Sequence, residues 1–403
     1  MTTTPVSPQA LAVNGGSPVR ATLLPYGRQS VDEDDIQAVV NVLRSDWLTT
    51  GPKVGEFEEA FAARVGSTHA VSFSSGTAAL HAAAFAAGLK PGDEAITSPL
   101  TFAATANCVL YQGATPVFAD IAADTLNINP RQISQKISGK TRAILPVDYA
   151  GHPADMAPIL ECAEKHGLVV IEDACHALGA EYGGRHVGSI ADMTVFSFHP
   201  VKHVTTGEGG MVTTNDAKFA ETLRRFRNHG ISSEARQRQS AGQWHYEMVL
   251  LGFNYRLPDI LCALGIQQLQ KLDANLARRR QIAARYTAAF REIPGVIAPA
   301  VRADANPAWH LYPIRLDMEK LTAGRAEVFR ALRAENIGVN VHYIPVHLHP
   351  YYRDQLGHKA GECPVAEDAY ERLISLPMFH GMSHQDVEDV IEAVNKVIGC
   401  FRK

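Results

Sequence analysis

The sequence predicts an α/β protein whose large domain carries a mostly parallel sheet of about seven strands, with a smaller α+β domain towards its C-terminal end. Between residues 67 and 215, short apolar segments alternate with helical patterns, which is typical of βαβ units. Several of these segments are apolar at every position, as expected for parallel strands covered on both faces. A chain of 403 residues also favours a large and a smaller domain over a single core.

The alternation places the elements of the large domain. We expect strands at Ala70–Phe73, Glu94–Thr97, Thr115–Phe118, Ala143–Val147, Leu168–Glu172, Thr194–Ser197 and Met211–Thr214. We expect helices at Thr77–Ala87, Ala154–His166 and Ala217–Asn228. Ligands of such sheets bind at the carboxyl ends of the strands, so the functional site should lie where these strands end.

The remaining segments predict three regions: a polar, disordered leader (1–20), an N-terminal segment with the large domain (21–255), and connecting helices with the small C-terminal domain (256–403). We expect Ser30 to cap the first helix and the run Arg278–Arg280 to lie on a solvated helix face. The C-terminal helices are expected at Pro258–Leu272, Asn275–Glu292, Gly324–Glu335, Val365–Leu373 and His384–Ile398, and the strands at His310–Leu316 and Val339–His342.

Composition excludes several classes of protein. Charged residues make up 20% of the chain and the net charge is −4, so we expect no nucleic-acid partner. The chain has neither a long apolar segment nor the pattern of a secretory signal, so we expect no membrane partner. The six cysteines are scattered without a close pair, which indicates reduced thiols in the cytoplasm and no metal site. We interpret His347, His349, Tyr351 and Tyr352 as ordinary loop residues.

The motif S-S-G-T, Ser74–Thr77, directly follows a strand and opens a helix. Gly76 lets the backbone approach an anion, Ser75 and Thr77 supply hydroxyls, and the helix N-terminus supplies N–H groups. Together these groups suit a phosphate. The alternative interpretation is a plain helix cap.

The motif V-V-I-E-D-A, Val169–Ala174, places a carboxylate at the end of an apolar strand. Burial of that carboxylate is costly unless a partner compensates. A protonated pyridine nitrogen would be such a partner for Asp173, and the pairing would make the ring a better electron sink. A helix cap and a magnesium ligand are the alternatives.

The motif S-F-H-P-V-K-H-V-T-T-G-E-G-G, Ser197–Gly210, places Lys202 just past a strand in a loop rich in serine, threonine and glycine. A surface lysine is the plain interpretation, but a confined lysine can become neutral and form an imine. Ser197 could add a phosphate contact. A phosphate cradle, a carboxylate and a lysine at three strand ends together predict a site for pyridoxal phosphate, with Lys202 as its Schiff-base lysine.

From about Leu24 to Lys403, the chain resembles the sugar-nucleotide aminotransferases of the DegT/DnrJ/EryC/StrS family. The motifs that carry the resemblance are L-T-T-G-P (Leu48–Pro52), S-S-G-T-A-A-L, P-L-T-F-A-A-T-A-N (Pro99–Asn107), E-D-A-C-H-A-L-G (Glu172–Gly179), S-F-H-P-V-K and L-G-F-N-Y-R (Leu251–Arg256). The resemblance implies a fold-type I aminotransferase that depends on pyridoxal phosphate.

The resemblance also implies roles for individual residues. Lys202 would be the catalytic lysine, Asp173 would pair with the pyridine nitrogen, and Phe102 would lie against the ring. Asn254 would reach the phosphate of the neighbouring subunit, which implies a homodimer with shared active sites. His176 stands where glutamine is commonest in the family, and it is either a ligand of the phenolic oxygen or a structural histidine. The implied cofactor-binding residues are Ser75, Gly76, Thr77, Phe102, Asp173, His176, Ser197, Lys202 and Asn254.

Within the family, the chain is similar to the branch that acts in pseudaminic acid biosynthesis, through stretches such as L-P-Y-G and V-H-Y-I-P. This similarity implies transfer of an amino group, from L-glutamate, to carbon 4 of a UDP-linked 4-keto-6-deoxy N-acetyl hexose. Tyr26 and Tyr343 could equally be core aromatics. The implied substrate-binding residues are Tyr26, Trp47, Leu48, Thr49, Thr50, Asn254, His342, Tyr343, Ile344 and Pro345.

Three other functions remain open from the sequence. The substrate could be another 4-keto sugar, of the perosamine or 4-amino-4-deoxy-arabinose type, or an aminocyclitol precursor. A related sugar dehydratase would carry histidine in place of Lys202, although His203 lies next to it. A non-catalytic regulator that binds the cofactor usually has an added DNA-binding domain, and the short leader leaves no room for one.

Overall fold

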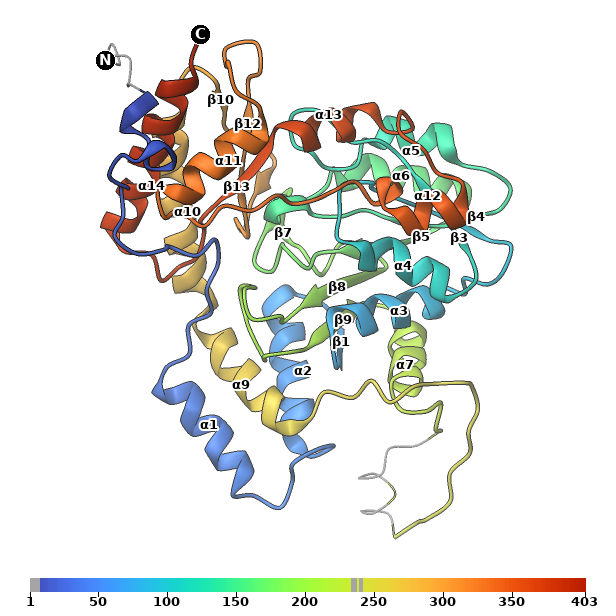
Figure 1. The fold of residues 1–403 in the computed structure, drawn as a ribbon. Helices are drawn as coiled ribbons and strands as arrows, with labels where there is room; N and C mark the ends of the chain where they lie inside the picture. The colour runs from blue at the N-terminus through green and yellow to red at the C-terminus, as the bar shows by residue number, and fades with distance from the viewer. Residues whose placement is uncertain (1–7, 233–237, 239–241) are drawn as a thin grey trace.

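A computed structural model describes residues 8–232, 238 and 242–403. Its large domain is built on a seven-stranded sheet of order β1-β9-β8-β5-β4-β2-β3 (Figure 1). The neighbours from β8 to β3 pair in parallel, whereas β9 is antiparallel to both β1 and β8. The predicted mostly parallel sheet is therefore confirmed. The strands are β1 (His69–Phe73), β2 (Glu94–Thr97), β3 (Thr115–Phe118), β4 (Thr141–Leu145), β5 (Val169–Asp173), β8 (Met193–Ser197) and β9 (Gly210–Thr214).

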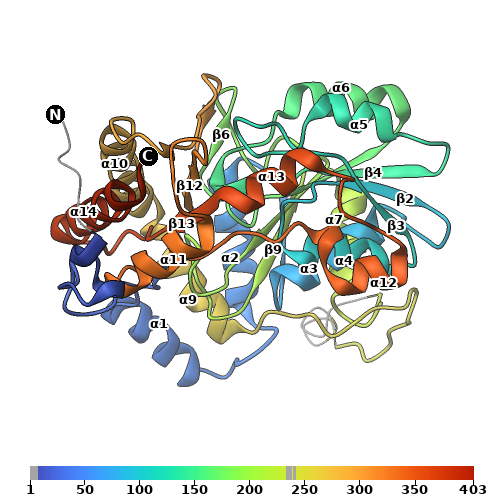
Figure 2. The same cartoon turned by 45° about the horizontal axis from the view of Figure 1, so that its top comes forward.

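Helices cover both faces of this sheet, as Figure 2 shows for α3 and α4 on one side and α5 and α6 on the other. The strands alternate accordingly: Ala143 and Leu145 of β4 join the core beneath α3, while Ile144 joins the core beneath α6. Apolar side chains on both faces explain why these strands read as continuous apolar segments. The covering helices are α2 (Pro52–Val65), α3 (Gly76–Ala86), α4 (Ala103–Tyr111), α5 (Pro130–Lys136), α6 (Met156–His166) and α7 (Ala217–Phe226).

The strands that carry the predicted motifs end at one edge of the sheet. β1 and β8 are both antiparallel to β9, so they run in the same direction, and β5 is parallel to β8. The S-S-G-T turn, Asp173 and Ser197 therefore meet at a shared edge, as the motif positions predicted.

A second core forms around the antiparallel sheet β10-β12-β13 and the helices α10, α11 and α14, away from the large sheet (Figure 1). The predicted strand Val339–His342 is wrong, because Asn340 makes only an isolated bridge to Ser375. The third strand is instead the fully buried β13, which starts at the residue where a helix was expected to end. These elements are α10 (Leu272–Phe290), β10 (Val296–Ile297), β12 (Tyr312–Leu316), α11 (Arg325–Ala334), β13 (Leu373–Leu376) and α14 (His384–Phe401).

The remaining elements connect the two cores. α1 and α9 pack on each other beside α2, and α12 and α13 return to the large domain, where Tyr352 and Ala366 join its core. They are α1 (Glu33–Leu43), α9 (Asp259–Gln270), α12 (Pro350–Leu356), α13 (Pro364–Arg372), the strands β6 (Glu181–Tyr182), β7 (Arg185–His186) and β11 (Ala305–Asn306), and the 3-10 helices η1 (Pro8–Ala10), η2 (Ala12–Asn14), η3 (Tyr149–Gly151) and η4 (Val346–Leu348). The predicted boundary at residues 255 and 256 stays a prediction.

Two local expectations are wrong. Asp32, and not Ser30, caps α1, because its carboxylate accepts from the N–H of Asp35 in a reciprocal capping box. Arg279 is 1% exposed and not solvated. Its guanidinium donates to the carbonyl oxygens of Trp309, His310 and Met378, and these hydrogen bonds compensate its burial.

The N-terminal segment is attached to the small domain. Of the predicted disordered leader, residues 1–7 lie outside the described residues, whereas residues 8–20 pack on α11 and α14. Leu11 is fully buried, and the buried carboxylate of Glu335 accepts from the backbone N–H groups of Ala12 and Val19 and from Lys396. Farther along the chain, Leu24 forms a β-bridge with Ile337. The backbone carbonyl oxygen of Tyr26 accepts from the backbone N–H of Met378. Within the described residues, no helix is long and apolar enough to cross a membrane.

Glu335→Ala should lower the free energy of unfolding by about 3 kcal/mol, because it leaves two N–H groups and one ammonium without their acceptor. Urea denaturation measures this loss. Glu388→Gln is the control. Glu388 forms an exposed ion pair with Arg285, so this substitution should change the free energy of unfolding by less than about 0.5 kcal/mol. Equal losses in the two variants would contradict the anchoring role of Glu335.

Candidate active site

A cavity of about 520 Å³ opens at the carboxyl edge of the large sheet. It receives side chains from the ends of β1, β5 and β8, from the start of α4, and from segments of the N-terminal and C-terminal regions. Its lining comprises Tyr26, Ser75, Gly76, Thr77, Leu80, Thr101, Phe102, Ala104, Val147, Asp173, Cys175, His176, Ser197, His199, Val201, Lys202, Glu208, His310, Asn340, Val341, His342 and Tyr343.

At one end, the cavity meets the N-terminus of α3. Ser75 caps this helix by accepting from the N–H of Ala78 at 3.1 Å, so the interpretation as a helix cap is correct for its side chain. Gly76 and Thr77 still line the cavity, and the first N–H groups of a helix lack partners within the helix. A Cβ on Gly76 would lie 3.0 Å from the Cβ of Ser197. Glycine therefore keeps the helix start close to Ser197, and the two strand ends form one polar cradle.

Asp173 ends β5 and is oriented by two donors. The hydroxyl of Thr105 donates to its Oδ2 at 2.6 Å, and the N–H of Cys175 donates to its Oδ1 at 3.1 Å. The hydroxyl of Thr101 lies 2.8 Å from that of Thr105, which extends the hydrogen-bonded chain from α4 to the segment before it. The carboxylate is therefore held in one orientation at the cavity wall.

Two further carboxyl groups lie buried behind Asp173. Asp148 and Glu172 are both fully buried, and each keeps one oxygen without a hydrogen-bond partner among the described residues. Burial raises the pKa of Glu172 to about 7, with the hydroxyl of Thr194 opposing the rise, and burial followed by the charge of Glu172 raises the pKa of Asp148 well above its usual range. We infer that a proton is shared between these two carboxyl groups, because two unscreened carboxylates would repel each other.

Lys202 reaches the cavity from the loop after β8. Its Nζ lies 3.4 Å from Nε2 of His310, a residue on the C-terminal side of the chain. Burial lowers the pKa of the Lys202 amine, and Arg279 lowers it further, while Cys175 and Asp173 act in the opposite direction. The amine therefore loses its proton more readily than an ordinary surface lysine.

His176 and Tyr343 form a contact on the cavity wall. The hydroxyl of Tyr343 lies 3.0 Å from Nε2 of His176, whose Nδ1 is buried without a partner among the described residues. Burial holds the pKa of His176 well below its usual range, and the neighbouring Lys202 adds to this effect. His176 is thus a neutral ring on the cavity wall whose Nε2 contacts Tyr343. This geometry leaves open both expected roles of His176.

Aromatic side chains border the cavity mouth. Phe102, the residue before α4, is 62% exposed although it is a large apolar ring, and its centroid lies 6.1 Å from that of Tyr343. Tyr26 packs against His342, whose Nδ1 lies 2.9 Å from the hydroxyl of Ser375. Tyr26 and Tyr343 therefore belong to the cavity wall. These rings offer flat apolar surface to a planar ligand.

Some predicted residues lie outside this lining. The stretch Trp47–Thr50 lies before α2, where the N–H of Gly51 donates to Asp259. Asn254 is exposed and pairs with Asn228 in an isolated bridge, Ile344 is exposed, and Pro345 is buried behind the lining. Within one subunit, the fold does not bring these residues to the cavity.

Other residues of the lining were missed by sequence reasoning. Thr105 lies in the P-L-T-F-A-A-T-A-N motif, and its place on a helix just after Phe102 was a usable signal. No sequence motif marked His310 as a site residue, because it reaches Lys202 only through the packing of the two domains. In residues 8–232, 238 and 242–403, no group of three or more histidine, cysteine, aspartate or glutamate residues is placed to hold a metal ion.

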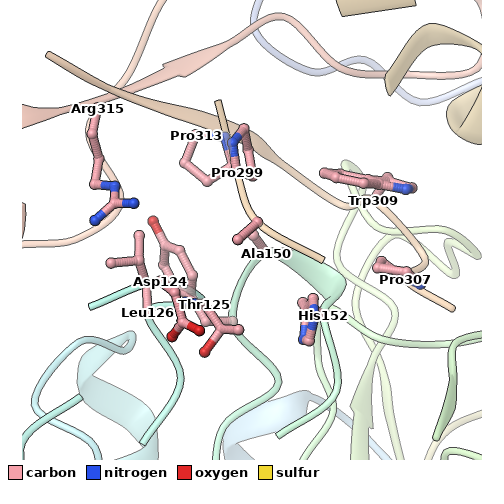
Figure 3. Close-up of a pocket in the computed structure, with 12 residues that line it drawn as sticks. Asp124, Thr125, Leu126, Ala150, His152, Pro299, Pro307, Trp309, Pro313 and Arg315 are labelled. Atoms are coloured by element: carbon pink, nitrogen blue, oxygen red, sulfur yellow. Dashed lines mark hydrogen bonds between the residues drawn. The ribbon is translucent and has the colours of Figure 1, made fainter. Parts of the chain in front are cut away.

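A second hollow, shown in Figure 3, lies between the segment around Ala150 and the C-terminal residues Trp309 and Pro313. Its volume is about 20 Å³, which suits about one water molecule. Tyr149 lines it and donates its hydroxyl to the carbonyl oxygen of His342 at 2.5 Å. This hollow is part of the domain junction and is too small for a substrate.

Comparisons with known proteins agree with this geometry. A model of the DegT/DnrJ/EryC1/StrS aminotransferase family matches residues 29–395. The chain belongs to this family. It is 48% identical over 381 residues to the spore coat polysaccharide biosynthesis protein SpsC of Bacillus subtilis, covering 94% of this chain and 98% of that protein.

Solved structures of aminotransferases share the fold. Helicobacter pylori PseC, an aminotransferase of pseudaminic acid biosynthesis, superposes with a TM-score of 0.88 at 34% identity, covering 94% of this chain and all of PseC (100%). A putative sugar aminotransferase from Streptococcus pneumoniae in its PMP form also gives 0.88, at 32% identity and 93% and 99% coverage. As a member of this family, the chain has the fold-type I architecture that the sequence predicted.

Glu172→Gln should flatten the pH dependence of stability. Native Glu172 keeps its proton up to about pH 7, whereas the unfolded residue loses it near its ordinary pKa of 4.5, so the wild type loses unfolding free energy between these values. Glutamine does not titrate and can still accept from Thr194. Relative to the wild type, the variant should gain about 2 kcal/mol as the pH rises from about 5 to 8.

Urea denaturation at several pH values measures this difference. Glu164→Gln, at an exposed position of α6, is the control and should follow the wild type. Parallel pH profiles for Glu172→Gln and the wild type would rule out the shared proton.

Proposed function

We propose that this chain, a pyridoxal-phosphate-dependent sugar aminotransferase, moves an amino group from L-glutamate to carbon 4 of a UDP-linked 4-keto-6-deoxy N-acetyl hexose. The observation that carries the proposal is the meeting of Lys202, Asp173 and the N-terminus of α3 around one cavity. The likeness to PseC supports a substrate of pseudaminic acid biosynthesis.

The residues present fit the cofactor. Ser75, Gly76, Thr77 and Ser197 would hold the phosphate, where helix N–H groups and hydroxyls meet. Asp173, oriented by Thr105, would pair with the pyridine nitrogen. His176, on the cavity wall, would be a partner for the phenolic oxygen, and exposed Phe102 offers a stacking surface for the ring.

Lys202 is the proposed catalytic residue. When bound, pyridoxal phosphate supplies an aldehyde carbon that bonds to amines and a ring that withdraws electrons from the reacting carbon. Lys202 would hold the cofactor at this position. When free, its Nζ would take the proton from the α-carbon of glutamate and keep it within the site for the next transfer. In the second half-reaction Lys202 moves a proton in the reverse sense, to carbon 4 of the sugar.

Asp173 and the acids behind it assist this proton transfer. The Asp173 carboxylate would keep a proton on the pyridine nitrogen of the bound cofactor, which would strengthen electron withdrawal. The proton that Asp148 and Glu172 share limits the negative charge next to Asp173.

The sugar nucleotide would enter past Tyr26, His342 and Tyr343, which border the cavity. Ile344 and Pro345 follow these residues directly, and Trp47, Leu48, Thr49 and Thr50 would come from the second subunit of a dimer. Another 4-keto sugar, of the perosamine or 4-amino-4-deoxy-arabinose type, is the alternative substrate. The relative SpsC is named for spore coat polysaccharide biosynthesis.

The dehydratase alternative is disfavoured by the position of His203. Its Nε2 lies 2.9 Å from the carbonyl oxygen of Ala308, and its side chain is buried outside the cavity lining. Lys202, and not His203, therefore faces the space where a cofactor would lie.

A homodimer with shared active sites is part of the proposal. The segment before α9 exposes apolar side chains, with Trp244 84%, Met248 67% and Leu251 74% exposed. An exposed apolar stretch of this size indicates a surface that another protein covers. Asn254 lies at the end of this stretch. In a dimer formed through this surface, the Asn254 amide of one copy would reach the phosphate-binding end of the other copy's cavity. A cytoplasmic location is also proposed, and the six free cysteines agree with it.

Lys202→Ala should abolish transamination. Wild-type protein with bound cofactor should show a yellow band at roughly 410–430 nm that L-glutamate removes and the correct UDP-4-keto sugar restores. The variant should lack this lysine-bound band and show no turnover, while Lys165→Ala, at an exposed position of α6, should behave as the wild type. A near-normal rate for Lys202→Ala would contradict the role of Lys202 as the catalytic lysine.

Mixed dimers test the role of Asn254. If its amide acts across the interface, hybrids of Lys202→Ala and Asn254→Ala subunits contain one intact site made from the two unaltered residues. Co-expression should then raise activity well above that of either single variant, with up to half of wild-type activity per hybrid. If the hybrid has only half the activity of the Asn254→Ala dimer, as expected from its single Lys202, Asn254 acts within its own subunit or not at all.

A further inference from the structure

His310 lies opposite Lys202 although the two belong to different parts of the fold. It stands between β11 and β12, and its Nε2 is 3.4 Å from the Lys202 amine. Its backbone is held on two sides. Arg279 donates to the carbonyl oxygen of His310, and Gly151 packs so closely that a Cβ there would lie 2.9 Å from the His310 nitrogen. The imidazole is therefore presented to Lys202 by a rigid junction.

The surroundings of the ring indicate which nitrogen carries its proton. Nδ1 of His310 is buried and has no hydrogen-bond partner anywhere in the described parts of the chain. A buried N–H without an acceptor is costlier than a ring nitrogen that lacks a donor. The proton therefore belongs on Nε2, the nitrogen that faces Lys202. A donor on Nε2 needs a lone pair, which the lysine amine has only in its neutral form.

Burial and one neighbouring cation keep the imidazole neutral. Lys202, His176 and His203 face it, together with Arg279, which stays cationic. Burial, followed by these neighbours, holds the pKa of His310 well below its usual range. His310 therefore does not become a cation that would repel a charged lysine, and it remains a neutral donor near pH 7.

We propose that His310 is a positioning residue that donates its Nε2 proton to the free Lys202 amine and so keeps that amine neutral and aimed into the cavity. This inference rests on the proposed role of Lys202. This hydrogen bond would form whenever the Lys202 amine is not bonded to the cofactor. At those stages of the reaction Lys202 must accept a proton from carbon. Asp173 and Cys175 favour the charged amine, and His310 offsets their influence.

The basicity of Lys202 in the cofactor-free protein tests the proposal. Competitive labelling with acetic anhydride over a range of pH, read at the Lys202 peptide by mass spectrometry, gives the pKa of the amine. His310→Leu removes the donor but keeps an apolar wall, and should lower labelling near pH 7 by about tenfold, corresponding to a pKa about one unit higher. His310→Gln keeps a donor that cannot be charged, and should stay within about threefold of the wild type.

His380→Gln is the matched control, because this histidine also has a buried Nδ1 without a described partner but lies outside the cavity lining. It should label as the wild type does. An unchanged or lower pKa in His310→Leu would overturn the proposal, since it would mean that the imidazole accepts from a charged lysine or does not interact with it.

A measurement on the unaltered chain covers the case in which His310→Leu fails to fold. Nitrogen-15 chemical shifts of the His310 ring, assigned by comparison with His310→Gln, should show the proton on Nε2. A proton on Nδ1 would overturn the proposal. Failure of the wild type to form the glutamate-sensitive yellow band would instead sink the proposed function, and the labelling result would still stand.

With the cofactor bound, the pH profile of kcat separates positioning from a general structural defect. His310→Leu should move the acid limb upward by about one pH unit with little change in KM for glutamate, and His310→Gln should restore it. A uniform loss at all pH values would indicate a structural effect only and would count against the inference.

Discussion

The partly buried position of the Lys202 amine at the edge of the large sheet is the constraint on which the other features of the site depend. An ammonium group loses part of its hydration there, so its neutral form becomes more available as a nucleophile and proton acceptor. The opposing influence of Asp173 and Cys175 keeps the shift moderate. The lysine can therefore change its charge during a reaction cycle, which a surface lysine cannot readily do near pH 7.

The carboxyl groups of the site also lose hydration on burial, and hydrogen bonds compensate this cost unequally. Asp148, Glu172 and Asp173 lie close together beneath the cavity, and three carboxylates could not all ionise there. Asp173 has two donors, from Thr105 and Cys175, whereas its neighbours each keep an unpaired oxygen. Hydrogen bonding thus fixes the orientation of the carboxylate that faces the cavity.

The junction between the two cores completes the wall of the cavity. Arg279 of α10 joins the carbonyl oxygens of Trp309, His310 and Met378, and Tyr149 joins the large domain to the carbonyl oxygen of His342. These bonds fix the segments that carry His310 and Tyr343. A site built from both cores in this way depends on their relative position, so packing far from Lys202 supports its chemistry.

The sequence alone determined the large sheet and the half of the site built from its strand ends. Strands β1, β5 and β8 are apolar segments followed by polar turns, so their ends, and with them Gly76, Asp173 and Ser197, could be placed to within a residue or two. Other features required the tertiary structure. Val339–His342 has a strand-like composition but finds only one bridge, Arg279 looks solvated but is buried, and Leu11 is covered by α11 and α14. The contact of His310 with Lys202 joins residues 108 positions apart. Local patterns record periodicity and caps, which act over a few residues, whereas contacts across the domain junction depend on how whole elements pack and leave no local pattern in the chain.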